Sequence, residues 1–93
     1  MTSNLTPFVR FTYTILDPDG RPCQKSLVVN LSYIISIEAR PSNDLKIFLT
    51  NNQVISIELG DLLDANEILE EILSTSAAGS EFCVYKIDTF EKN

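Results

Sequence analysis

The chain has 93 residues, of which 44% are hydrophobic and 22% are charged, so its length and composition fit one folded domain and exclude a wholly disordered chain. Thirteen acids against seven bases give a net charge of −6, which opposes binding to nucleic-acid phosphates and to an anionic membrane surface. The sequence has no His and only two Cys, so the commonest general base and most transition-metal sites are missing. We expect no cofactor and no metal.

We expect neither a signal peptide nor a membrane span. Residues 1–10 lack a basic start followed by an apolar run, and the apolar-rich stretch 26–37 is too short and too polar to cross a bilayer. We expect a cytoplasmic protein made of one domain, 1–93, with flexible ends at 1–6 and 91–93. Cys23 and Cys83 are expected as reduced thiols, and a disulfide between strands stays open as an alternative.

Alternation of apolar and polar residues predicts most of the elements. The first strand covers 9–15, the turn Asp17-Pro18-Asp19-Gly20 follows, and the second strand covers about 24–30. The next three strands, 31–39, 45–49 and 55–59, each place their odd-numbered apolar residues on one face. That face is expected to cover the core.

This shared parity predicts how the middle strands pair. A three-residue turn at 41–43 sets Ile37 opposite Ile47, and one at 51–53 sets Ile47 opposite Ile57. The outer face then carries a cross-strand charge row, which we expect to be Glu38, Lys46 and Glu58.

After Gly60 the apolar spacing changes from two to the helical period. Asp64 is the expected cap of a helix that begins near Ala65, with Glu67 completing a capping box. The helix ends within 74–79, and a last strand, 82–88, places Cys83, Tyr85 and Ile87 on one face. The order βββββαβ predicts an α+β fold, with one curved, mainly antiparallel sheet of about six strands and one amphipathic helix on one face.

No motif for catalysis or metal binding stands out. The sequence has no phosphate-binding glycine loop and no nucleophile elbow, and its Ser and Thr residues have no His to activate them. Asp17 and Asp19 before Gly20 resemble part of a calcium loop, but the Glu at the twelfth position is missing. We expect a protein that is not an enzyme.

Acidic residues are segregated in the second half of the chain. Five of them lie close together at the predicted helix: Asp61, Asp64, Glu67, Glu70 and Glu71. One interpretation is an ordinary solvated helix face. The other is an acidic surface that attracts a basic partner, which in its extreme form imitates nucleic-acid phosphates and occupies a nucleic-acid-binding protein.

Three apolar residues fall on the outer face of the predicted middle strands: Ile34, Phe48 and Val54. They are either scattered side chains, or covered by the first or last strand, or a protein interface. An isologous homodimer is the first expectation for an interface. We therefore predict a small non-enzymatic protein–protein interaction or assembly module that forms a homodimer, with an acidic decoy of a nucleic-acid-binding protein as the alternative.

Overall fold

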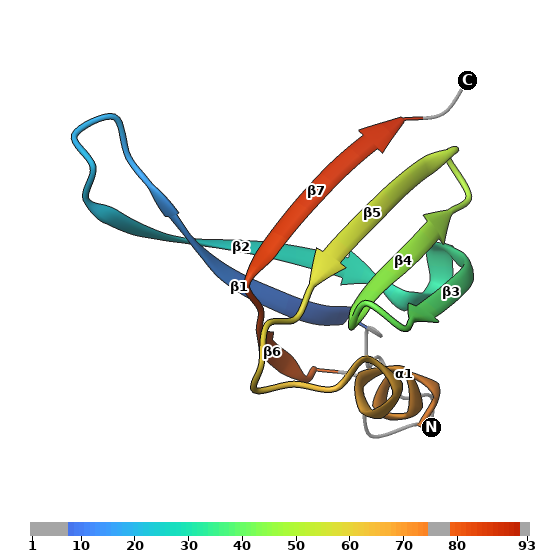
Figure 1. The fold of residues 1–93 in the computed structure, drawn as a ribbon. Helices are drawn as coiled ribbons and strands as arrows, with labels where there is room; N and C mark the ends of the chain where they lie inside the picture. The colour runs from blue at the N-terminus through green and yellow to red at the C-terminus, as the bar shows by residue number, and fades with distance from the viewer. Residues whose placement is uncertain (1–7, 75–78, 92–93) are drawn as a thin grey trace, which may run out of the picture.

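Two sheets and one helix make up the fold in the computed structural model, which describes residues 8–74 and 79–91 (Figure 1). The strands are β1 (Phe8–Leu16), β2 (Pro22–Asn30), β3 (Ile34–Arg40), β4 (Asp44–Leu49), β5 (Gln53–Glu58), β6 (Glu81–Cys83) and β7 (Lys86–Glu91). A 3₁₀ turn, Leu31–Tyr33, precedes β3, and the helix α1 (Ala65–Leu73) follows β5. The predicted α+β class is confirmed.

The strands divide into a three-stranded sheet of order β2-β1-β6 and a four-stranded sheet of order β3-β4-β5-β7. Instead of one last strand at 82–88, the chain changes sheets: β6 pairs parallel with β1, and β7 pairs antiparallel with β5. Val84 is buried at the crossing, whereas Cys83 and Tyr85 are exposed, so the prediction that Cys83, Tyr85 and Ile87 share one face of a single strand is wrong. The physical reason is that the Val84 N–H bonds to the Thr12 carbonyl and the Tyr85 N–H to the Glu58 carbonyl, which joins the two sheets.

The β3–β4 register is as predicted, with Ile37 opposite Ile47 and Glu38 opposite Lys46. The β4–β5 register differs, because Ile47 lies opposite Ile55 and Lys46 opposite Ser56. The predicted row Glu38, Lys46, Glu58 is therefore wrong at its last member. Asn52 has φ 65°, so the three-residue loop ends on Asn52, a residue type that tolerates the left-handed region, and not on Gln53.

The third predicted strand begins at Ile34 and not at residue 31, and the odd-numbered residues at its start do not face the core. Asn30 Oδ1 accepts a hydrogen bond from the Ser32 N–H and begins the 3₁₀ turn, and a β-bulge shifts the register between Ile34 and Ser36. Tyr33 and Ile35 are therefore exposed, and Ile34 packs against the core. The bulge inserts one residue and so reverses which neighbours face inward.

The helix begins as predicted at Ala65. Asp64 Oδ2 accepts a hydrogen bond of 3.1 Å from the Glu67 N–H, which is the expected capping contact. The core lies between α1, the base of the β1–β2 hairpin and the odd-numbered face of the four-stranded sheet, and its most deeply buried side chains include Val9, Phe11, Leu45, Ile47 and Ile57. The predicted flexible segments 1–6 and 92–93 lie outside the described residues, and Glu91 is the last residue of β7.

Candidate functional site

The β1–β2 hairpin extends beyond the body on which its base packs (Figure 1). Its base is buried through Val9, Phe11 and Val29, but every residue of 14–26 except the half-buried Asp17 is exposed. We call residues 14–26 the arm. Figure 1 shows it projecting away from β6, from the four-stranded sheet and from α1, and the molecule is 50 Å long against 29 and 27 Å in the other directions.

The arm carries apolar side chains beyond the core. On the face that buries Phe11 and Leu27 at the base, the next pairs outward are Tyr13 opposite Lys25 and Ile15 opposite Cys23. On the other face Leu16 lies opposite Pro22 and is 69% exposed. The apolar pattern of the hairpin thus continues onto a part that has no layer to cover it.

The arm tip is a hydrogen-bonded turn. Asp17 Oδ1 accepts hydrogen bonds from the Asp19 and Arg21 N–H groups, at 2.9 and 2.8 Å, and the Asp17 N–H donates to the Arg21 carbonyl. Gly20 completes the turn at φ 82°, which favours glycine. These bonds use the Asp17 carboxylate as a structural acceptor and hold the tip in one shape.

A second feature is a hollow of about 830 Å³ between the β3–β4 turn, the loop that leads to α1 and the link between β6 and β7. Six carboxylates line it: Asp44, Glu58, Asp61, Asp64, Glu67 and Asp88. We call it the acidic hollow. Arg40 is the one cation among its lining residues and lies 3.8 Å from Asp44, and Lys86 outside the lining lies 3.5 Å from Asp88.

Apolar side chains are also exposed at the acidic hollow. Leu62 is 97% exposed and Tyr85 is 69% exposed, and both line it. Within residues 8–74 and 79–91, no three His, Cys, Asp or Glu side chains come together in a way that could hold a metal ion. The acidic hollow therefore combines dispersed negative charge with apolar contact area.

Asn43 builds the rim of this hollow. Its Nδ2 donates to the carbonyls of Gly60 and Leu63, at 2.9 and 2.8 Å, and its Oδ1 accepts from the Ala65 N–H at 2.8 Å. The residue lies at φ 61°, the third position of the β3–β4 loop, which turns its side chain toward the segment before α1. One side chain thus fixes the loop that carries Asp61 and Leu62.

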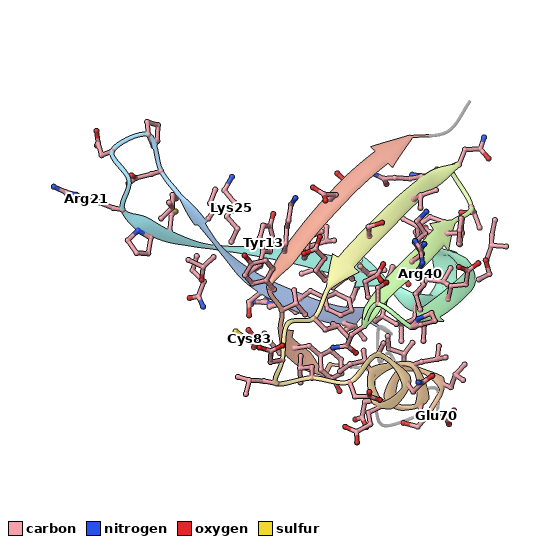
Figure 2. All side chains as sticks on the ribbon, in the orientation of Figure 1. Tyr13, Arg21, Lys25, Arg40, Glu70 and Cys83 are labelled. Carbon is pink, nitrogen blue, oxygen red and sulfur yellow. The ribbon has the colours of Figure 1, made fainter. Side chains whose placement is uncertain are left out.

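The five acidic residues predicted as a partner surface are all exposed. Asp61, Asp64 and Glu67 line the acidic hollow. Glu70 and Glu71 lie farther along α1, and Figure 2 shows Glu70 on the side of the helix away from the arm. The structure therefore divides the predicted surface in two and adds Asp44, Glu58 and Asp88 to its first part.

The three residues predicted as an exposed apolar patch do not form one. The bulge places Ile34 on the core side, and Val54 is only 2% exposed. Phe48 is half-buried and lies opposite Val54 on the outer face. Of the alternatives set out for these residues, the structure fits cover over Val54 and not one open patch, and the bulge that turns Ile34 inward was not expected from the sequence.

Both cysteines are free thiols and exposed. Cys23 is a residue of β2 on the arm, and Cys83 lies opposite Thr12 near the base of the arm, where Figure 2 labels it. The open alternative of a disulfide between them is not realised. None of the helices within the described ranges is long and apolar enough to cross a membrane.

The arm itself was not predicted. The available signal was the alternation of apolar and polar residues over 9–15, before Asp17-Pro18-Asp19-Gly20; the strands on the two sides of this turn have nine residues each. Comparison of the chain with protein-family models, with curated proteins and with solved structures finds no match.

Proposed function

We propose that the protein is a non-enzymatic protein–protein interaction module that forms a homodimer through its arm. The observation that supports this is the exposure of residues 14–26. A two-stranded hairpin is marginally stable in water by itself, and it gains stability when a further strand or layer covers it. A partner that covers the arm would supply that layer.

A second copy is the favoured partner because closed two-fold dimers are the commonest soluble oligomers. In such a dimer each arm is covered once, so both copies gain the same stabilisation. We place the protein in the cytoplasm, since the exposed Cys23 and Cys83 thiols suit a reducing compartment.

Light scattering after gel filtration, over a range of protein concentration, tests this function. We expect the mass of the wild type to approach twice 10.4 kDa as concentration rises. The variant Ile15→Thr/Leu16→Thr keeps strand-forming residues but removes apolar area from the arm, and we expect it to be monomeric. Ile35→Thr is the matched control, because Ile35 is exposed but lies outside the arm, and it should remain dimeric. A wild type that stays monomeric at every concentration contradicts the homodimer.

The acidic hollow favours a second candidate, an acidic module that binds a basic protein in place of a nucleic acid. Its six carboxylates and exposed Tyr85 offer charge and stacking area to arginine side chains. Binding of a poly-arginine peptide by calorimetry tests it. We expect affinity that falls steeply with salt, and no binding, or binding unchanged by Glu58→Lys/Asp61→Lys, contradicts it.

A further inference from the structure

We infer that the open edge of β2 pairs antiparallel with the same edge of a second copy, with Ser26 opposite the partner's Ser26. This inference rests on the proposed homodimer and names the surface that forms it. A two-fold axis then passes between the two Ser26 residues, and the two three-stranded sheets join into one. The direction of the β2 backbone groups, the neighbours that this register creates and an apolar cleft along the edge support it.

Alternate residues of β2 direct their backbone groups to the open edge. β2 lies at the edge of its sheet, next to β1. The Thr12 carbonyl of β1 accepts from the Val84 N–H, on the side of β1 away from β2. Ser26 lies opposite Thr12, and opposed residues in an antiparallel pair share either both backbone bonds or neither. The N–H and the carbonyl of Ser26 therefore face the open edge, and by the same alternation so do those of Gln24 and Val28.

β2 is also the longest and least protected of the edge strands in the described sheets. It has nine residues, whereas β6 has three, β7 has six and β3 contains a β-bulge. Short strands and bulges protect an edge from pairing with another chain. The one charged residue of β2 is Lys25, although the chain has a net charge of −6. A second acidic chain can therefore pair with this strand without placing carboxylates of the two strands against each other.

The register at Ser26 joins the exposed arm to the core of the partner. It sets Cys23 opposite the partner's Val29. Within each copy, Ile15 lies opposite Cys23 and Val9 opposite Val29. One cross-strand row thus runs from the exposed Ile15 to the partner's Val9, which is fully buried. Such cross-strand neighbours stabilise a sheet, so the apolar pattern of the arm is continued by a second copy of the same chain.

The opposite face of the arm gains an apolar row in the same register. Pro22 comes to lie opposite the partner's Asn30. Leu16 lies opposite Pro22 and Phe8 opposite Asn30 within each copy, so the row has an apolar side chain at each end. Leu16 is 69% exposed and Phe8 is 37% exposed in the single copy. Pairing at Ser26 therefore brings together exposed apolar residues on this face as well.

Charge and backbone bonding favour the same register. Lys25 lies opposite the partner's Leu27, whereas a shift by two residues places Lys25 opposite the partner's Lys25. Like charges directly opposite each other are destabilising. The Ser26 register also pairs Gln24 with the partner's Val28, so the outward backbone groups of these residues and of Ser26 form about six hydrogen bonds across the axis.

An apolar cleft of about 220 Å³ runs along this edge. Residues 27–30 line it from β2, and Leu49, Ile55 and Thr89 line it from the four-stranded sheet. Successive side chains of a strand point to opposite faces, so four successive lining residues place the cleft at the edge of β2. The partner's Cys23, opposite Val29, lies at this cleft in the proposed register. The four-stranded sheet thus provides a layer over the partner's arm.

Disulfide cross-linking tests the register. The variant is Ser26→Cys in the background Cys23→Ala/Cys83→Ala. Across the axis the two Cα atoms at position 26 would be about 5.5 Å apart, a distance that a disulfide spans, so we expect mild oxidation to give a covalent dimer. Gln24→Cys in the same background is the matched control. Its two Cα atoms would be roughly 13 Å apart along the strands, so it should not cross-link.

Removal of one outward N–H tests the edge itself. Ser26→Pro removes a donor that points away from β1, so the change costs the fold no ladder bond, and circular dichroism and thermal unfolding verify that the variant folds. We expect the dimer dissociation constant, from sedimentation equilibrium, to rise roughly tenfold or more, because one backbone bond is lost on each side of the axis. Ser26→Thr keeps the N–H and should remain near the wild-type value.

Three results overturn the inference, and they separate it from the proposed homodimer. If the wild type dimerises but Ser26→Pro keeps the wild-type dissociation constant, the homodimer stands and pairing of the β2 edges is wrong. Cross-linking of Gln24→Cys in place of Ser26→Cys contradicts the register. A wild type that is monomeric at every concentration overturns the homodimer and this inference with it.

Discussion

The Nδ2 amide of Asn43 donates a hydrogen bond of 2.8 Å to the carbonyl oxygen of Leu63, so a turn between two strands holds the loop that leads into the helix. The same side chain accepts from the Ala65 N–H and donates to the Gly60 carbonyl. Its backbone meanwhile closes the β3–β4 turn, through a bond of 2.9 Å from its N–H to the Arg40 carbonyl. Asn43 thus links hairpin geometry to the shape of the acidic hollow.

Replacing Asn43 therefore has a specific expected cost. Asn43→Gly keeps a residue that adopts φ 61° easily, so the change removes the side-chain bonds without adding backbone strain. We expect a loss of about 2 kcal/mol or more in the free energy of unfolding, measured by urea denaturation, because two backbone carbonyls and one backbone N–H lose their bonds. Asn52→Gly is the matched control at φ 65° in the next hairpin, with an expected change within about 0.5 kcal/mol. Equal losses at both positions would show that the side-chain hydrogen bonds of Asn43 contribute nothing to stability.

The cap of α1 provides a second test. Asp64→Ala removes the acceptor of the Glu67 N–H, and we expect it to lower the free energy of unfolding by about 1 kcal/mol. Asp64→Asn preserves an oxygen acceptor and should change stability by only a few tenths of a kcal/mol, since Asn and Asp cap about equally well. Thermal unfolding of the three proteins measures the difference. A loss in Asp64→Asn as large as in Asp64→Ala would assign the effect to charge and not to capping.

Burial departs from the odd-number pattern at two apolar residues, Val54 and Ile35, which gives them opposite expectations. Val54 is 2% exposed, so Val54→Asp buries a carboxylate without a partner, and we expect it to unfold the protein or to cost at least about 3 kcal/mol. Ile35 is 66% exposed, so Ile35→Asp should leave the fold intact with a loss below about 1 kcal/mol. Proton–nitrogen correlation spectra distinguish the two outcomes. If Val54→Asp is tolerated and Ile35→Asp unfolds the protein, the odd-numbered residue is the buried one at both places, which contradicts the structure.

Local patterns in the sequence predicted part of the fold. The core-facing sides of β4 and β5 were predicted correctly because every odd-numbered position there except Gln53 is apolar, whereas the even-numbered positions are mostly polar. The helix start was predicted because Asp64 and Glu67 have the spacing of a capping box. Both predictions rest on residues that lie close together in the sequence, and the structure agrees with both.

The errors have a different origin. The β4–β5 loop could have been placed by asking which residue tolerates positive φ, since Asn52 does so and Gln53 does not. The bulge at Ile34 and the change of sheets at Val84 depend on partners distant in sequence, such as Phe48 and Thr12. The acidic hollow likewise joins Asp44, Glu58 and Asp88 to Asp61 through strand pairing. Charge density in the sequence indicated only the helix part of it.

Amide hydrogen exchange of the arm tests the central claim most directly, because it reports whether a second copy covers residues 14–26. We expect arm amides to gain protection as protein concentration rises through the dimer dissociation constant, since a bare hairpin opens at little cost in free energy. Amides of Ile47 and Ile55 in the core strands should keep the same protection throughout. Arm amides that exchange at one rate over the whole concentration range would contradict a dimer formed through the arm.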